Sequence, residues 1–267
     1  MPDSEDNVVP AGYASNLFDL RGRTAVITGG GSGLGAAIAI GYAQVGVKVA
    51  LLDVNVEGMK ATQSSISSQG GVSEIFECDV TSKAALEKTS EKILKKFSSV
   101  DILVNSAGAA FRCPAEDFPE DKLDFILNLN LKGTYLAGQV FGNIMLKQGK
   151  GNIINIASIG GFNAYPLASA YNASKGGVVQ LTRSFALEWG TRGVRVNGIG
   201  PTLMDSPLTK KGAATSSVTA DFIKSRMLRD RLGLPRELIG AAIFLASDAS
   251  ELVNGHTIMC DDGYLIA

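Results

Sequence analysis

Residues 24–53 read TAVITGGGSGLGAAIAIGYAQVGVKVALLD and decide the fold of this chain. A short apolar run ends at Thr28, a glycine-rich turn covers residues 29–35, and an apolar helical segment follows. Glycines let the backbone turn tightly and approach a pyrophosphate closely. The N-terminus of the next helix offers unpaired N–H groups and the positive end of its dipole. This order predicts a dinucleotide-binding turn; a flexible glycine linker is the alternative.

The second apolar run of this stretch, residues 47–52, ends in Asp53. An acidic residue about 20 positions beyond the glycine turn can accept hydrogen bonds from an adenosine ribose. Its carboxylate would repel a 2′-phosphate, and neither Ser32 nor Val54 supplies a compensating positive charge. We therefore expect NAD to be preferred to NADP. The alternative is an ordinary surface aspartate at a strand end.

Tyr171 and Lys175 are four residues apart in SAYNASK, residues 169–175, so on a helix they share one face. An ammonium beside a phenol stabilises the phenolate and lowers the tyrosine pKa from its ordinary value of about 10. Such a tyrosine can act as a general acid or base. Ser158, which ends an apolar run upstream, is the candidate partner, although a strand-end serine can also be structural.

Strands and helices alternate along the chain, which is typical of a doubly wound parallel sheet. We predict an α/β, single-domain Rossmann fold, with a mostly parallel seven-stranded sheet and helices on both faces. Residues 1–19 form an N-terminal arm, residues 20–267 form the domain, and residues 202–234 form a flap over the site or a surface insertion without a role. The predicted strands are 24–27, 47–52, 73–77, 102–105, 152–157, 194–199 and 257–260, and the predicted helices are 33–45, 56–69, 83–97, 122–147, 169–190 and 236–247.

Composition narrows the class of function. The formal net charge of −1 gives the surface no attraction to nucleic acid or an anionic membrane. His256 is the only histidine, which rules out a Ser-His-Asp triad and a histidine metal cluster. Cys78, Cys113 and Cys260 are widely spaced and show no metal or redox pattern. We expect no metal, and the acidic start and the lack of a long apolar run favour a cytoplasmic protein.

From residue 20 to residue 264 the chain resembles the short-chain dehydrogenase/reductase family, in its single-domain form. Thr28 to Gly35 match the family's Thr-Gly-x-x-x-Gly-x-Gly turn, and residues 105–108, NSAG, match its Asn-Asn-Ala-Gly. Asp79 and Val80 match a pair that lies against adenine in the family. The catalytic residues implied by the resemblance are Asn130, Ser158, Tyr171 and Lys175.

The resemblance also implies a role for each residue. Lys175 would bind the nicotinamide ribose and keep Tyr171 acidic, Ser158 would hold the substrate oxygen, and Tyr171 would exchange the proton. Asn130 would kink its helix and hold a water linking Lys175 to solvent. The cofactor-binding residues implied together by the residues and the resemblance are Thr28, Gly29, Gly31, Ser32, Gly33, Leu34, Gly35, Asp53, Asp79, Val80, Asn105, Ala107, Gly108, Tyr171, Lys175, Pro201, Thr202, Met204 and Ser206.

Two positions depart from the family pattern. Thr202 follows Pro201 where the family usually has glycine, which restricts the backbone near the nicotinamide. Asp262 replaces the first glycine of the usual Asp-Gly-Gly. An extra carboxylate there would alter either a subunit contact or the floor of the substrate pocket.

The chain is most similar to the sugar-acid and polyol dehydrogenases of the family, such as gluconate 5-dehydrogenase and 2-deoxygluconate 3-dehydrogenase. The candidate substrate-binding residues are Arg112, Ser158, Asn163, Tyr165 and Tyr171. Arg112 could pair with a carboxylate or be an exposed loop arginine. Three alternatives stay open: an apolar ketone or steroid-like alcohol in a pocket of Phe111, Phe162, Met204 and Leu208; a carrier-bound 3-oxoacyl substrate; and a non-catalytic NAD-binding regulator.

The resemblance further implies a homotetramer. Helices 122–147 and 169–190 carry apolar residues on more than one face, so a face that does not cover the sheet would need a partner. Family members pair these helices across one two-fold axis and use the last strand for a second. Asp262 would add charge repulsion near the second contact. The apolar residues behind this prediction are Leu136, Val140, Phe141, Ile144, Val178, Leu181, Phe185 and Trp189.

Overall fold

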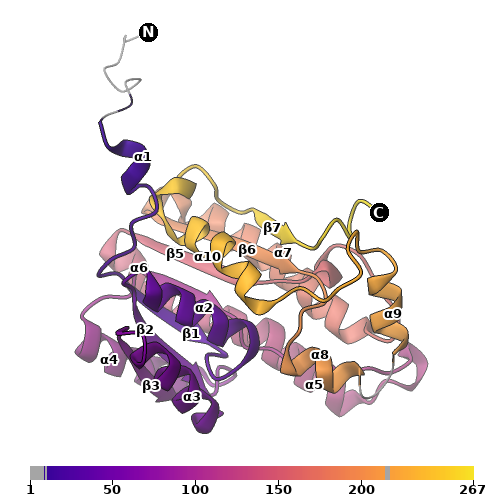
Figure 1. Cartoon of the computed structure of the whole chain (residues 1–267). Coiled ribbons are helices and arrows are strands. Elements are labelled where there is room, and N and C mark those ends of the chain that lie inside the picture. Colours follow the sequence, from indigo (N-terminus) through magenta and orange to yellow (C-terminus); the bar gives the residue numbers. More distant parts are fainter. Residues whose placement is uncertain (1–8, 10, 214–216) are drawn as a thin grey trace.

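Seven parallel strands form one sheet in the order β3-β2-β1-β4-β5-β6-β7, at the centre of the molecule (Figure 1). This computed structural model describes residue 9 and residues 11–213 and 217–267. The predicted fold class is confirmed. The strands are β1 (Thr24–Thr28), β2 (Lys48–Asp53), β3 (Ser73–Glu77), β4 (Ile102–Asn105), β5 (Gly151–Ile156), β6 (Val194–Pro201) and β7 (Thr257–Cys260).

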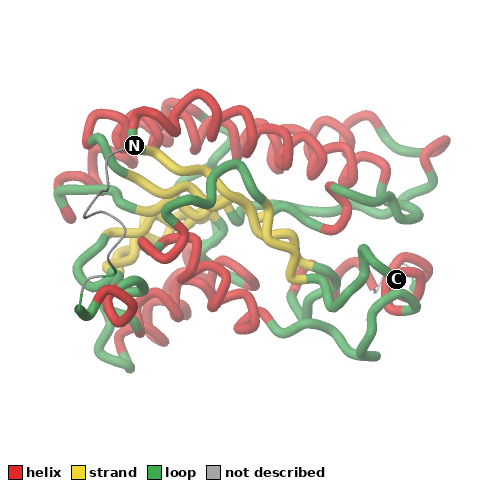
Figure 2. The backbone as a smooth tube through the Cα atoms, turned by 90° about the horizontal axis from the view of Figure 1, so that it is seen from above, coloured by secondary structure: helices red, strands yellow, loops and turns green. Residues whose placement is uncertain are grey.

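Helices cover both faces of the sheet (Figure 2). One face packs against α2 (Gly33–Gln44), α3 (Val56–Ser67) and α10 (Ile239–Ala246), around a core that includes Ile38, Met59 and Leu245. The other face packs against α4 (Lys83–Phe97), α6 (Gly133–Gln148) and α7 (Ser169–Trp189), around a core that includes Leu86, Phe141 and Phe185. The apolar strands are buried on both sides, which explains their near-continuous hydrophobic runs.

The strand order fixes where a ligand can bind. The chain builds β1, β2 and β3 outward in one direction and then returns to place β4 on the other side of β1. The connections after β1 and β4 therefore diverge to opposite faces, which opens a crevice at the carboxyl ends of these two strands. The glycine turn follows β1 and residues 105–108 follow β4, so both predicted motifs lie at this crevice.

The long helix predicted over residues 122–147 is present, and it changes helical type near its middle. The predicted helix 122–147 consists of α5 (Glu120–Leu127), a π-helical turn (Asn128–Lys132) and α6. A π turn often bends a helix, and Asn130 lies within it. The last predicted helix likewise begins with a 3-10 turn, Pro235–Leu238, before α10.

Two segments expected to be irregular contain short helices. The predicted arm holds α1 (Tyr13–Asn16), while its residues 1–8 and 10 lie outside the described part. The predicted flap holds α8 (Pro207–Ala213) and α9 (Val218–Lys224), with residues 214–216 outside the described part. None of the described helices combines the length and the apolar character needed to cross a membrane.

Asp262 is held within its own chain. Its backbone is left-handed, with φ of 53°. One carboxylate oxygen accepts a hydrogen bond from the Arg229 backbone N–H at 2.8 Å, and the other accepts one from Arg229 Nε at 2.6 Å. Arg229 holds the pKa of Asp262 below its ordinary value through these bonds. The carboxylate therefore joins the C-terminal segment to the end of the flap and does not reach the floor of the main cavity.

Most of the apolar residues that suggested a partner surface are already covered. Phe185 stacks on Trp189 at 4.1 Å between ring centroids, and both rings are buried within the chain. The exposed apolar side chains on these helices are Leu123, Phe125, Tyr135 and Leu187. The apolar pattern thus mainly reflects packing of these helices within the core on one face of the sheet.

A buried chain of hydrogen bonds ties β4, β5 and α7 together. Asn105 Nδ2 donates to Asn155 Oδ1 at 2.9 Å, and Asn155 Nδ2 donates to Thr182 Oγ1 at 2.9 Å. All three side chains are buried. The link lies three residues before Ser158, so it fixes the strand end from which that serine projects.

Asn155→Ala should lower the free energy of unfolding by about 2–3 kcal/mol, because it leaves the buried amide nitrogen of Asn105 without an acceptor and removes the donor to Thr182, whose hydroxyl keeps its bond to the Val178 carbonyl. Urea unfolding measures the change. Ser184→Ala, which trims a hydroxyl from a less buried site on α7, is the matched control and should change stability by less than about 0.5 kcal/mol. Equal effects from the two variants would contradict the proposed importance of the buried link.

Candidate active site

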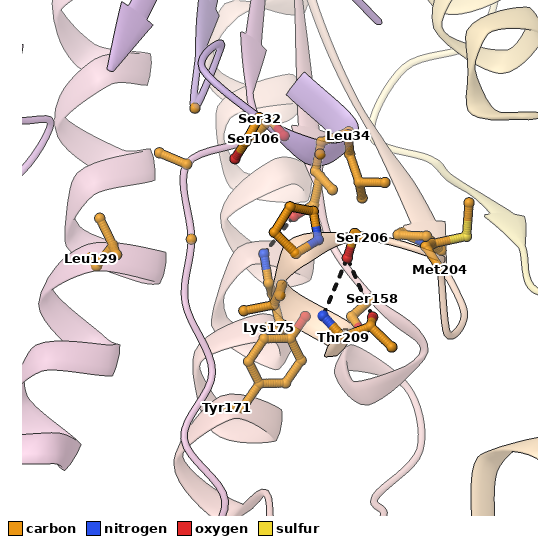
Figure 3. Close-up of a pocket in the computed structure, with 18 of the residues that line it drawn as sticks. Ser32, Leu34, Ser106, Leu129, Ser158, Tyr171, Lys175, Met204, Ser206 and Thr209 are labelled. Carbon is orange, nitrogen blue, oxygen red and sulfur yellow. Dashed lines mark hydrogen bonds between the residues drawn. The ribbon is translucent and has the colours of Figure 1, made fainter. Parts of the chain in front are cut away.

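A cavity of about 780 Å³ lies at the carboxyl ends of the strands (Figure 3). The glycine turn and the end of β2 form one part of its wall, and the loop after β4 forms another. The end of β5, the start of α7 and the segment from Pro201 to Ile223 form further parts, together with the residues after β3 and those between Phe125 and Lys132. The parallel sheet thus brings residues from widely separated stretches of sequence to one space.

The glycine turn is held against the loop that follows β4. The Thr28 hydroxyl accepts hydrogen bonds from the backbone N–H groups of Ser106 and Ala107, at 3.1 and 3.2 Å. Gly29 has φ of 69°, and a Cβ there would lie 2.9 Å from Ala107 N. A Cβ at Gly35 would meet the carbonyl oxygen of Gly29. These positions need glycine because backbone segments approach too closely for a side chain.

Asp53 closes the turn at its outer side. One of its carboxylate oxygens accepts from Gly31 N at 3.0 Å, and the other accepts from Asn55 N at 3.0 Å. The carboxylate is therefore fixed beside the glycine turn and lines the cavity. Its position suits contact with the ribose of a dinucleotide whose phosphates lie at the start of α2.

Ser158, Tyr171 and Lys175 meet at the inner part of the cavity. Figure 3 shows the Tyr171 hydroxyl directed toward Ser158, with Lys175 beside it. Ser158 Oγ accepts a hydrogen bond from Gly160 N at 3.0 Å. Lys175 Nζ donates to the carbonyl oxygen of Ile156 at 2.7 Å and lies 5.8 Å from the centroid of the Tyr171 ring. The four-residue spacing in the sequence correctly predicted that Tyr171 and Lys175 lie close together.

Burial disfavours the charged forms of Lys175 and Tyr171. It lowers the pKa of Lys175 to about 8. Burial also raises the pKa of Tyr171 above its ordinary value, while hydrogen bonding to Ser158 and the charge of Arg112 act in the other direction. The net direction for Tyr171 in this structure is opposite to the lowering expected from the sequence. The spacing of Tyr171 and Lys175 in the sequence did not show that the phenol is partly buried in the cavity wall.

Arg112 points into the cavity and does not lie free in solvent. Its guanidinium carbon is 5.5 Å from the centroid of the Tyr165 ring and 5.6 Å from that of Tyr171. Its Nη1 is buried and has no hydrogen-bond partner within the described part of the chain. Tyr165 is buried beside it, and that burial raises the pKa of Tyr165. A buried, unpaired guanidinium donor is costly unless a ligand meets it.

Asn130 braces the site from behind. Its Oδ1 accepts from Ala109 N at 2.8 Å, and its Nδ2 donates to the Ala109 carbonyl at 2.9 Å and to Ser174 Oγ at 3.0 Å. The side chain therefore connects the π-helical turn to the loop after β4 and to α7. Its role in holding a relay water stays a prediction.

The predicted site residues divide into two groups. Thr28, Gly31, Gly35, Asn105 and Asn130 support the wall without lining it, and Asn163 is exposed away from it, so the geometry gives Asn163 no support as a substrate contact. The predicted residues that line the cavity are Gly29, Ser32, Gly33, Leu34, Asp53, Asp79, Val80, Ala107, Gly108, Arg112, Ser158, Tyr165, Tyr171, Lys175, Pro201, Thr202, Met204 and Ser206.

Several lining residues were missed from the sequence. They come from the end of α5, the π-helical turn and the two flap helices, whose positions depend on tertiary packing. One local signal was present: Ser206 precedes Pro207 and accepts a hydrogen bond from Thr209 N at 3.3 Å, as a helix-capping serine does (Figure 3). The missed residues include Phe125, Leu129, Lys132, Thr209, Thr219, Ala220 and Ile223.

The residues present fit a nicotinamide dinucleotide. The glycine turn leaves a cradle that side chains would fill, and Asp53 stands at its outer side. Near Ser206, the hydroxyl of Thr202 is buried and has no hydrogen-bond partner among the described residues. No group of three or more His, Cys, Asp or Glu side chains in the described ranges is placed to hold a metal ion.

Comparisons with known proteins agree with this geometry. The family model described as "Enoyl-(Acyl carrier protein) reductase" matches residues 29–265. D-threitol dehydrogenase of Mycolicibacterium smegmatis is 41% identical over 249 residues, covering 93% of this chain and 95% of that protein. 2-dehydro-3-deoxy-D-gluconate 5-dehydrogenase of Bacillus subtilis is 37% identical, with 95% and 99% covered.

A solved structure gives the same result. Gluconate 5-dehydrogenase from Burkholderia cenocepacia, in complex with NADP and tartrate, superposes with a TM-score of 0.89. The two chains are 33% identical, and the match covers 95% of this chain and 99% of the other. The fold is therefore shared over nearly the whole length of both chains.

Proposed function

Because the chain belongs to the short-chain dehydrogenase/reductase family and is an oxidoreductase of CH–OH groups, we propose that it interconverts a sugar acid or related polyol with the corresponding ketone. We further propose NAD as its preferred cofactor. The relatives named above act, by their names, on threitol, a deoxygluconate derivative and gluconate.

The observation that carries the proposal is the buried, unpaired Nη1 of Arg112 beside Tyr171. A guanidinium binds a carboxylate through two parallel hydrogen bonds, and such pairs are strong where water is excluded. A polyhydroxy acid would satisfy this donor while a secondary hydroxyl lies at Ser158 and Tyr171. The tartrate in the relative's complex is itself a hydroxy acid.

The chain's own groups then have distinct tasks. The glycine turn and the first turn of α2 would hold the pyrophosphate, and Asp53 would hold the adenosine ribose. Asp79 and Val80 would lie against the adenine, and the segment from Pro201 to Ser206 would hold the nicotinamide end. Bound NAD supplies the hydride acceptor. Ser158 hydrogen-bonds the substrate oxygen, and Tyr171 takes the hydroxyl proton in oxidation. Lys175 stabilises the phenolate.

The test of the substrate class is NAD-linked turnover of matched pairs: gluconate against its neutral polyol, and tartrate against threitol. We expect a higher kcat/KM for the acid in each pair, and Arg112→Met should remove that advantage while leaving the neutral polyol less affected. A preference for apolar ketones would contradict the sugar-acid proposal. Cofactor binding without turnover of any alcohol or ketone would support the non-catalytic alternative.

Tyr171→Phe should reduce kcat by about 100-fold or more, because it removes the proposed acid–base group and keeps the ring. Binding of NADH, followed by nucleotide fluorescence, should stay close to that of the wild type. Turnover within about tenfold of the wild type would exclude the phenol from proton transfer.

The cofactor prediction concerns the charge of Asp53. Kinetics with both cofactors should give a higher kcat/KM for NAD than for NADP. Asp53→Asn keeps an acceptor for Gly31 N and removes the negative charge, so it should raise the NADP-to-NAD ratio by about tenfold or more. A wild type that uses NADP equally well would refute the prediction.

Assembly and location stay proposals. We propose a homotetramer in the cytoplasm, supported by the resemblance of α6, α7 and β7 to elements through which the family assembles. The exposed Tyr135 on α6 and Leu187 on α7 are apolar side chains that such an interface would cover.

A further inference from the structure

We infer that Arg112 supplies a second positive charge to the Tyr171 phenol, so that the charge of the bound substrate sets the pH range of oxidation. This inference rests on the proposed role of Tyr171 as the acid–base group. It goes beyond carboxylate recognition, because it makes one residue act on both specificity and the proton-transfer step.

Two cations lie at similar distances from the Tyr171 ring. The guanidinium carbon of Arg112 is 5.6 Å from the centroid of the Tyr171 ring, and the ammonium nitrogen of Lys175 is 5.8 Å from it. Arg112 comes from the loop after β4, whereas Lys175 comes from the same helix as the tyrosine. The helical spacing alone therefore accounts for only one of the two charges.

The charges of Lys175 and Arg112 respond differently to pH. Burial lowers the pKa of Lys175 to about 8, so its charge falls as the pH rises through that value. A guanidinium keeps its charge over the whole range in which proteins work. In mildly alkaline solution, Arg112 is the cation that continues to favour the phenolate.

Among the residues that the structure describes, no carboxylate offsets the charge of Arg112. The titratable and charged side chains that face Tyr171 are Arg112, Lys175 and Tyr165, with the hydroxyl of Ser158 as a neutral neighbour. Within the described residues, no carboxylate forms an ion pair with Arg112. A substrate carboxylate that binds Arg112 would then place a negative charge among these side chains. It would cancel much of the effect of Arg112 on the Tyr171 phenol.

The charge of Arg112 should shift the pH dependence of oxidation toward lower pH. Oxidation needs the phenolate, and a nearby positive charge lets it form at lower pH. Removing or neutralising Arg112 should move the acidic limb of the kcat profile upward by about 1 pH unit, the lower end of the range for a charge within about 4–6 Å.

The first experiment compares kcat profiles for a neutral polyol and the matching sugar acid. In the wild type, the acidic limb should lie about 1 pH unit higher with the acid than with the polyol. Arg112→Met should bring both limbs to the higher position, and Arg112→Lys, which keeps a cation, should restore part of the difference. Coincident limbs in the wild type would overturn the inference, even if the variants failed to fold.

The second experiment does not depend on turnover. The ultraviolet absorbance of tyrosinate is titrated with saturating NAD, and the curve of Tyr171→Phe is subtracted to isolate Tyr171. Adding succinate, a carboxylate without a hydroxyl, should raise the midpoint in the wild type and leave it unchanged in Arg112→Met. An unchanged midpoint in the wild type would refute the electrostatic role. Failure of all substrates alongside a succinate-dependent shift would instead refute only the proposed function.

Discussion

The close contact between the glycine turn and the loop after β4 is the constraint on which the site depends. Thr28 accepts two backbone hydrogen bonds from that loop, and Gly29 lies against Ala107 with no room for a side chain. The contact joins the two halves of the sheet at the point where their connections diverge. The glycine turn on the proposed cofactor side of the cavity and the loop after β4, which carries Arg112, are consequently fixed relative to each other.

The same packing places ionisable side chains in the centre of the site, where their charged forms are poorly solvated. Lys175, Tyr171 and Tyr165 are all largely buried, and burial disfavours the charged form of each. Arg112 adds a further charge with one nitrogen that finds no partner among the described residues. Such a site is stabilised when a ligand supplies the missing hydrogen bonds, which links substrate affinity to the relief of burial.

The features that could be predicted from the sequence are those that depend on residues close together in the chain. The glycine turn, Asp53 and the helical pair Tyr171 and Lys175 follow from local spacing, and the seven strands follow from apolar runs between turns. The contact of Arg112 with two tyrosine rings could not be predicted, since it joins residues 53 and 59 positions apart across a loop. The sequence also could not show that Phe185 and Trp189 stack inside the chain and that Asn163 is exposed and does not line the cavity. In each case the deciding factor is tertiary packing.

The link between Asp262 and Arg229 has a consequence for the two ends of the chain. Tyr264, two residues beyond Asp262, is fully buried in a cluster with Tyr165 and Ile223, both of which line the cavity. Residues near the C-terminus thus support the substrate wall although they contribute no side chain to it. An affinity tag or a proteolytic cut there would disturb catalysis from outside the cavity, whereas α1 near the other end contains no buried residue and would tolerate a fusion.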